Sequence, residues 1–368
     1  MLRLFERSWT REELLRYVGD PIQLGGVRRH TLSDGNQAGV EVAQFRTGSG
    51  LEFDVLLGRA MDISAAFYKG SSLCWRSATG DVAAPYFEPE GLGWLRTFFG
   101  GLVVTCGLDQ VGAPCVDRGQ PLGLHGRIST TPAANTWVDA GWDGDDYVMW
   151  AQGRMRQATV FGENISLTRK IWARLGESRF FMEDTVENLS FDPAEHMFLY
   201  HINLGFPVVS DGSVLIAPSK TVTPRDAEAE QGKEDYWRFT APVHGFKEKC
   251  YFHEMAADEA GKVTVAVANE EYAGGRGLGV YVRYDKTELP WFTEWKMMGE
   301  GVYVVGVEPA NCCVLGRAWQ REHGSLQVLG PREKREYRVE IGVLDGRAGI
   351  EELKRAAVSS GPLDKILP

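Results

Sequence analysis

Apolar and polar residues alternate along most of the chain, which is the pattern of strands with one buried face. In GVEVAQFRTGSGLEFDVLLG, residues 39–58, two such runs flank a Gly-Ser-Gly turn and predict a β-hairpin. The alternation returns in segments 137–157, 165–190, 262–272, 278–285, 302–309 and 335–344. Many short strands separated by turns, in a chain with 43 glycines, predict a large antiparallel β-sandwich.

Helical periodicity is confined to the two ends of the chain. In SWTREELLRYVGD, Ser8 or Thr10 can cap a short helix near residues 8–18, whose apolar positions follow at helical spacing. GIEELKRAAVSSG predicts a second helix near residues 349–359. No change of composition marks a linker, so we expect residues 1–368 to form one mainly β domain with a few short peripheral helices.

The charge balance restricts the partners. The 368 residues carry a formal net charge of −10 and no block of lysine or arginine, which argues against nucleic acid and against an anionic membrane surface. No apolar run approaches the roughly 20 residues of a membrane span, and MLRLFERSWTREELL lacks the apolar core of a signal peptide. The six cysteines include no CxxC pair, so we expect reduced thiols and a cytoplasmic protein.

Three residues that can exchange protons lie in turns or near strand ends. His125 lies between glycines in PLGLHGRIST, and Glu308 ends the apolar run of YVVGVEPANC. In FLYHINLGFP, the period of two places His201 and Asn203 on one face of a strand. Taken singly, each also fits a structural role, as a turn histidine, a polar core group and a strand end.

In this order, LHGR, YHINL and VEP resemble the motifs of the aldose 1-epimerase (galactose mutarotase) superfamily. The segments GRAMDI, GGLVVTCGLDQVG and LPWFTEWKMMGEGVYVVGVEP look like an uncharacterised branch of it. The resemblance implies a galactose mutarotase-like β-supersandwich without a cofactor. It also implies an isomerase that interconverts the anomers of a small carbohydrate, either a free sugar or a sugar acid.

The resemblance also implies the roles of the three residues. Glu308 would be the catalytic base, His201 the acid, and His125 would hydrogen-bond a sugar oxygen. The acid role requires His201 to be protonated part of the time near neutral pH, which a nearby carboxylate favours. The glycines beside His125 would leave room for the sugar ring.

The chain departs from the family pattern in the substrate-binding residues. The region TFFGGLVVTCGL lacks the arginine that the family carries before its first histidine, and the family's aspartate has no clear counterpart. Arg59 and Asp62 fit either a ligand site or an ion pair at i, i+3, and Lys296 or Arg127 could bind an anionic substrate. The candidate substrate-binding residues are Arg59, Asp62, Arg127, Asn203, Trp291, Trp295 and Lys296.

Two other functions remain open at this point. His125, His201 and His253 with Glu308 could hold a divalent metal, since imidazole and carboxylate suit Zn²⁺ or Mn²⁺, and catalyse a sugar isomerisation or elimination. Alternatively, the protein binds carbohydrate without turnover, because a fold alone does not imply a function. The sequence is also compatible with a homodimer.

Overall fold

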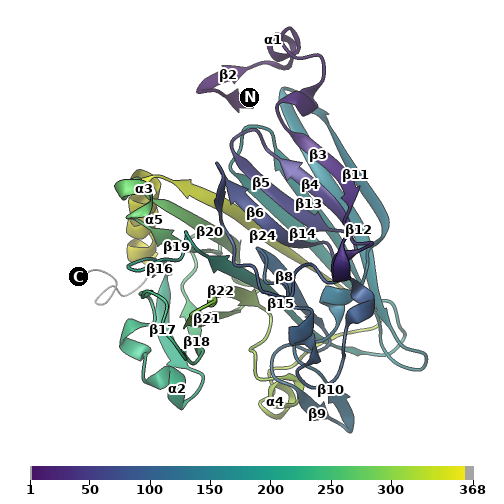
Figure 1. The fold of residues 1–368 in the computed structure, drawn as a ribbon. Helices are drawn as coiled ribbons and strands as arrows, with labels where there is room; N and C mark the ends of the chain where they lie inside the picture. Colours follow the sequence, from purple (N-terminus) through teal and green to yellow (C-terminus); the bar gives the residue numbers. More distant parts are fainter. Residues whose placement is uncertain (1, 361–368) are drawn as a thin grey trace.

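The computed structural model describes residues 2–360, and most of its strands form two large antiparallel sheets (Figure 1). Within this range, the eight-stranded sheet has the order β11 (Ala134–Asp143), β12 (Asp146–Ala158), β13 (Asn164–Arg174), β14 (Arg179–Asn188), β24 (Lys334–Asp345), β20 (Leu278–Asp285), β19 (Lys262–Asn269) and β16 (Val214–Ile216). The predicted mainly β sandwich is therefore confirmed.

The second sheet has twelve strands in the described range. Its order is β17 (Ser219–Pro224), β18 (Lys249–Met255), β21 (Trp291–Gly299), β22 (Val302–Ala310), β15 (Ala194–Gly205), β8 (Val103–Leu108), β6 (Asp62–Tyr68), β5 (Leu51–Leu56), β4 (Glu41–Arg46) and β3 (Gly26–Thr31). β23 (Gln327–Leu329) pairs with β15, and β7 (Ser71–Ser72) pairs with β6. The predicted hairpin is β4–β5, in which Phe45 pairs with Phe53.

Short elements lie outside the two large sheets. Two small hairpins are formed by β1 (Leu2–Leu4) with β2 (Arg7–Trp9) and by β9 (Cys115–Asp117) with β10 (Gln120–Leu122). The helices are α1 (Arg11–Leu15), α2 (Ala227–Glu230), α3 (Tyr272–Gly275), α4 (Arg317–Glu322) and α5 (Arg347–Ser360). No helix in the described range has the length and apolarity needed to cross a bilayer.

Both predicted terminal helices are present, but the first is shorter than expected. Thr10 caps α1 through a capping box with Glu13, whereas Ser8 belongs to β2. Only Leu14 of α1 is buried, so little tertiary packing supports a longer helix. At the other end, α5 begins two residues before the predicted 349 and ends one residue after the predicted 359.

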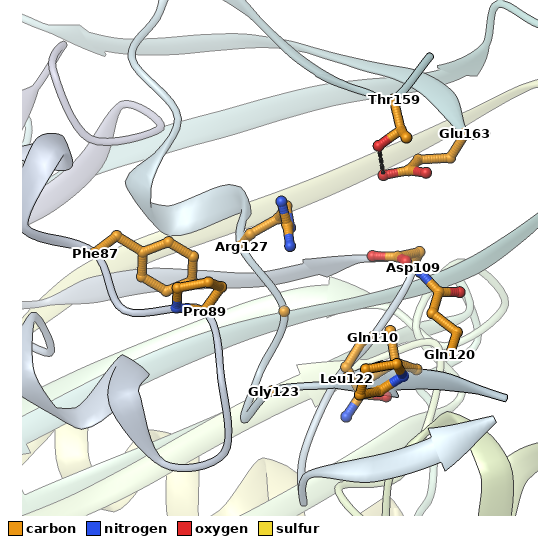
Figure 2. Close-up of a pocket in the computed structure, with 12 residues that line it drawn as sticks. Phe87, Pro89, Asp109, Gln110, Gln120, Leu122, Gly123, Arg127, Thr159 and Glu163 are labelled. Atoms are coloured by element: carbon orange, nitrogen blue, oxygen red, sulfur yellow. Dashed lines mark hydrogen bonds between the residues drawn. The ribbon is translucent and has the colours of Figure 1, made fainter. Parts of the chain in front are cut away.

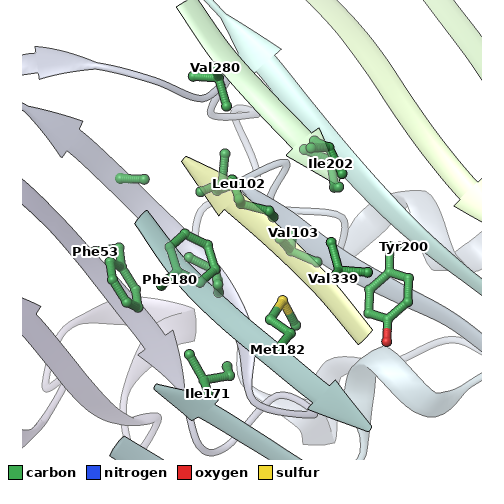
Figure 3. Close-up of a cluster of buried hydrophobic side chains, with 14 of the residues drawn as sticks. Phe53, Leu102, Val103, Ile171, Phe180, Met182, Tyr200, Ile202, Val280 and Val339 are labelled. Atoms are coloured by element: carbon green, nitrogen blue, oxygen red, sulfur yellow. The ribbon is translucent and has the colours of Figure 1, made fainter. Parts of the chain in front are cut away.

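The main core lies between the two sheets. Figure 3 shows part of it, with Ile171, Phe180 and Met182 from the eight-stranded sheet and Tyr200 and Ile202 from β15. All five side chains are almost completely buried. Their burial provides the hydrophobic stabilisation that holds the sheets together.

A charged cluster crosses this core. Arg169 of β13 donates two hydrogen bonds to the Asp184 carboxylate on β14 and lies 3.1 Å from Asp62 on β6, in the other sheet. Asp62 also accepts from the Thr105 hydroxyl, and Tyr200 donates to Asp184. A fully buried cation between two carboxylates therefore links the sheets.

The strands of the twelve-stranded sheet divide their side chains between two layers. On β15, Phe198, Tyr200 and Ile202 enter the core between the sheets. The alternate residues Met197 and Leu199 belong to a second apolar cluster, with Trp94 and Phe98 from the segment that precedes β8. His201 follows Leu199 on this second face, where the candidate site lies.

Candidate functional site

The structure brings His201 and Glu308 together on neighbouring strands. β15 and β22 pair antiparallel, with Ile202 opposite Val307, so the residues beside that pair also become neighbours. His201 Nε2 lies 3.3 Å from Glu308 Oε1, and both side chains are buried. The two residues are 107 positions apart in the sequence, and the sheet register alone makes them adjacent.

His125 reaches the same place from the loop after β10. Its ring centroid lies 5.5 Å from that of His201, and its backbone has a left-handed φ of 56°. Its Nδ1 accepts a hydrogen bond from the Gly112 N–H, so the ring proton is on Nε2. His125 therefore provides an N–H donor beside His201.

The glycines beside His125 serve backbone packing. A Cβ on Gly126 would lie 2.4 Å from the Gly107 carbonyl oxygen, and one on Gly123 would lie 2.1 Å from the Pro89 carbonyl oxygen. The prediction that they leave room for a sugar ring is wrong, because neighbouring backbone fills that space.

Aromatic rings surround the two histidines. His201 lies 5.4 Å from Trp295 on β21 and 5.2 Å from Phe98, and Trp94 lies 4.7 Å from His125, all between ring centroids. Trp291 lies on the same face of β21, opposite Ala310, and packs against the second apolar cluster. Such rings offer apolar faces that can stack on the C–H face of a sugar.

Burial favours the uncharged forms of the three central groups. It raises the pKa of Glu308 to about 8, with a contribution from Glu248, and lowers the pKa of His201 to about 4. Burial and the neighbouring His201 lower the pKa of His125 well below its usual range. At neutral pH these pKa shifts favour a protonated Glu308 beside a neutral His201. The expectation that the carboxylate keeps His201 partly protonated is wrong for the free protein, because desolvation outweighs it.

Two polar atoms of this pair lack hydrogen-bond partners in the described part of the chain. They are Glu308 Oε1 and His201 Nδ1, each buried. A Cβ on Gly306 would lie only 2.4 Å from Glu308 Oε1, so this glycine provides the space that the carboxyl group occupies. Buried polar atoms without partners are rare, and here they adjoin a group of aromatic rings.

The comparisons with known proteins agree with this architecture. Residues 37–343 match a family model described as Domain of unknown function (DUF4432). The chain belongs to the DUF4432 family. No curated protein matches its sequence.

Solved structures place the DUF4432 fold among the galactose mutarotase-like proteins. A putative aldose 1-epimerase from Klebsiella pneumoniae shares 23% identity at a TM-score of 0.85, over 93% of this chain and 91% of the other. A galactose mutarotase-like protein from Clostridium acetobutylicum shares 12% sequence identity at a TM-score of 0.61, and the match covers 88% of this chain and 99% of the other. Galactose 1-epimerase from Lactobacillus acidophilus NCFM shares 11% sequence identity at a TM-score of 0.56, and the match covers 88% of this chain and 100% of the other. At these identities the likeness shows the fold alone.

Other polar residues of this DUF4432 chain lie at the rim of the site. Glu248 accepts a hydrogen bond from Trp295 Nε1 at 2.9 Å and one from Arg225 at 3.0 Å. Arg225 also pairs with Asp226. The sequence analysis missed these residues because they fall in polar connecting segments without a motif. The pairing of β18 with β21 places Cys250 opposite Trp295, and Glu248 lies just before β18. This strand pairing is the signal that could have brought Glu248 to the site.

Arg59 and Asp62 do not reach the site. The Arg59 guanidinium donates to the backbone carbonyls of Ser129, Val82 and Thr97, and it is 1% exposed. Asp62 belongs to the Arg169 cluster in the core between the sheets. Neither the predicted ligand site nor the predicted mutual ion pair is found, because backbone carbonyls bind the Arg59 guanidinium and Asp62 pairs with Arg169 instead.

Lys296 and Asn203 also have internal partners. The Lys296 ammonium donates to the carbonyls of Asp235, Tyr236 and Arg238, on the opposite face of β21 from Trp295. Asn203 shares the face of His201, but its amide donates to backbone carbonyls, including that of His201 itself. The prediction that Lys296 binds an anion is therefore wrong. The Asn203 amide instead ties β15, the strand that carries His201, to the backbone before β8.

The four residues considered for a metal are not together. His253 points into the core between the sheets, where it lies 3.4 Å from Glu294 and hydrogen-bonds Ser219, apart from His125, His201 and Glu308. Among residues 2–360, no group of three or more His, Cys, Asp or Glu side chains is arranged to hold a metal ion. The proposed four-residue metal set is wrong.

Arg127 lines a hollow to which neither His201 nor Glu308 contributes. It is exposed and shares this polar hollow with Phe87, Gln120 and Glu163 (Figure 2).

Proposed function

We propose that this protein is an aldose 1-epimerase that interconverts the two anomers of a neutral sugar. The observation that carries the proposal is the buried Glu308–His201 pair, whose nearest atoms are 3.3 Å apart and which has unpartnered polar atoms beside aromatic rings. Mutarotation needs this combination, because one proton must leave the C1 hydroxyl while another reaches the ring oxygen.

The reaction can be written with every proton accounted for. His201, neutral at the start, takes the proton of the C1 hydroxyl, and Glu308 gives its proton to the ring oxygen as the C1–O bond breaks. The open-chain aldehyde rotates about its C1–C2 bond. On closure, the hydroxyl that was the ring oxygen returns its proton to Glu308 and attacks C1, while His201 returns its proton to the carbonyl oxygen.

Each residue therefore acts as acid in one half of the cycle and as base in the other. The sequence-based assignment of Glu308 as base and His201 as acid describes ring closure. The raised pKa of Glu308 and the lowered pKa of His201 support the opposite starting state for ring opening. His125, held neutral, donates its Nε2–H to a sugar oxygen.

The charges around the pair favour a neutral substrate over a sugar acid. Among the described residues, Arg225 is the cation whose charge acts on Glu308, and it is already paired with Asp226 and Glu248. Arg59 and Lys296 are bound by backbone carbonyls. Beside this pair, residues 2–360 would offer a carboxylate substrate no unpaired cation to compensate its desolvation.

The test is anomer exchange, followed by NMR with α-D-glucose and α-D-galactose. We expect Glu308→Gln to lower kcat/KM by roughly 10²–10⁴-fold, the usual contribution of a positioned acid or base. Glu183→Gln, the same chemical change on an exposed residue of β14, is the matched control and should exchange at the wild-type rate. Unchanged exchange in Glu308→Gln would exclude the assigned pair. Sugar binding without exchange in the wild type would favour the non-catalytic alternative.

A further inference from the structure

A second polar groove lies beside the His125 loop, and neither His201 nor Glu308 lines it. It consists of two adjoining hollows that share Asp109, Gln120, Thr159 and Glu163. The first is about 90 Å³ and is lined by Phe87 and Arg127 among others, and the second is about 470 Å³ and continues past Phe161. The larger hollow is within the range of small-molecule sites, roughly 300–1,000 Å³.

The groove presents donors and acceptors that the protein itself leaves free. Within residues 2–360, the Arg127 guanidinium has no hydrogen bond or ion pair, and neither has the Gln120 side-chain N–H. Glu163 uses one carboxylate oxygen to accept from Thr159, which leaves the other free. The Asp192 carboxylate at the far end also has no partner in this range. Figure 2 shows Arg127, Gln120 and Glu163 around one opening.

The walls are held in place by a buried ionic network. Arg317 donates to Asp109 and Asp117, and its guanidinium also donates to the carboxamide oxygen of Gln120. Arg321 completes the network by pairing with Asp117 and Glu195. These contacts fix the direction of Gln120 and Asp109, so the groove is preorganised and its acidic walls are largely neutralised.

The free groups define the ligand chemistry. Arg127 is opposed by Glu163 and Asp192, so the groove has no net positive charge to hold an anion. Planar side chains that donate and accept suit hydroxyl groups, which also do both. Phe87 at one end and the fully exposed Phe161 at the other offer ring faces for C–H groups.

We propose that this groove is a second binding site, for a neutral saccharide. It is separate from the Glu308–His201 pair, since neither residue lines it. The two sites share one loop, because Gly123, Gly126 and Arg127 line the groove while the intervening His125 ring packs on Trp94 and His201. A saccharide in the groove therefore contacts the loop that positions His125.

The experiment is saturation-transfer difference NMR with methyl β-D-galactopyranoside and sucrose. Both lack a free anomeric hydroxyl, so no epimerase can turn them over, and the result does not depend on the proposed reaction. The groove variant combines Arg127→Ala with Glu163→Ala, both on residues that line the groove. Arg16→Ala with Glu12→Ala, an exposed pair on and beside α1, is the charge-matched control.

We expect the groove variant to bind at least one probe about ten-fold more weakly, as the loss of hydrogen bonds to charged groups predicts, while the Arg16→Ala, Glu12→Ala control retains the wild-type signal. Equal signals in the wild type and the groove variant would overturn the proposal. Absence of saturation transfer from the wild type to both probes would overturn it as well.

Discussion

Glu308→Gln should stabilise the protein at neutral and weakly alkaline pH. The side chain is 2% exposed and burial raises its pKa to about 8, from 4.5 in the unfolded chain. Between these two values the native state holds one more proton than the unfolded state, so the free energy of unfolding falls as pH rises. The contribution of Glu308 is fully present below pH 4.5 and is lost by pH 8.

The interval of about 3.5 pH units sets the magnitude. At about 1.4 kcal/mol per pH unit, the buried carboxyl costs the wild type about 3–5 kcal/mol at pH 8 relative to pH 4.5. Glutamine has nearly the same shape and does not titrate. The variant should therefore gain this amount over the wild type across the interval. His201, whose lowered pKa makes stability rise between about pH 4 and 6.5, is present in both proteins.

Urea unfolding at half-unit steps from pH 4.5 to 8.5, followed by tryptophan fluorescence and far-ultraviolet circular dichroism, measures the two curves. The difference between them should widen steadily with pH, and Glu183→Gln should track the wild type throughout. Parallel curves for Glu308→Gln and the wild type would refute the reasoning, because they would mean that Glu308 titrates alike in the native and unfolded states.

Four further outcomes follow from the structure. The pH profile of kcat/KM should be flat between about 5 and 7 and fall above about 8 and below about 4, as the Glu308–His201 pair gains or loses its single proton; a monotonic profile contradicts a one-proton pair. Arg169→Met should lower the free energy of unfolding in urea by about 3–5 kcal/mol, because two buried carboxylates lose their cation; a loss below about 1 kcal/mol contradicts this role. Gly306→Ala should lower kcat in the anomer-exchange assay, since its Cβ would lie 2.4 Å from Glu308 Oε1 and 2.9 Å from the Trp295 Cβ; wild-type kcat would show that the carboxyl does not need that space. Trp295→Ala should raise KM by roughly 10-fold or more, as the loss of a stacking ring predicts, and an unchanged KM would remove Trp295 from the sugar wall.

The local part of the fold was predictable, and the long-range part was not. The period of two and the Gly-Ser-Gly turn are signals within about twenty residues, and they yield β4 and β5 correctly. The capping box at Thr10 is equally local. The placement of β8 between β6 and β15 depends on burial across the whole sheet, which no single segment encodes.

In the candidate site, sequence reasoning placed together the three residues that the structure also brings together. Their motifs carried that inference, whereas the rim residues Arg225 and Glu248 have none. Lys296 shows an avoidable error: as the neighbour of Trp295 on a strand, it must point to the opposite face. Arg59 shows an unavoidable one, because sequence does not reveal that backbone carbonyls from distant loops converge on a guanidinium.

The alternation along β21 has an evolutionary consequence. Trp291, Thr293 and Trp295 lie on the side of Glu308, while Phe292 and Lys296 point into the protein interior. Substitution of the first three residues would reshape the aromatic wall beside Glu308 and leave the layer that holds the sheets together intact. Under the proposed function, a change of sugar specificity would require substitutions only on the outer face of this strand, and the core between the sheets would stay constant.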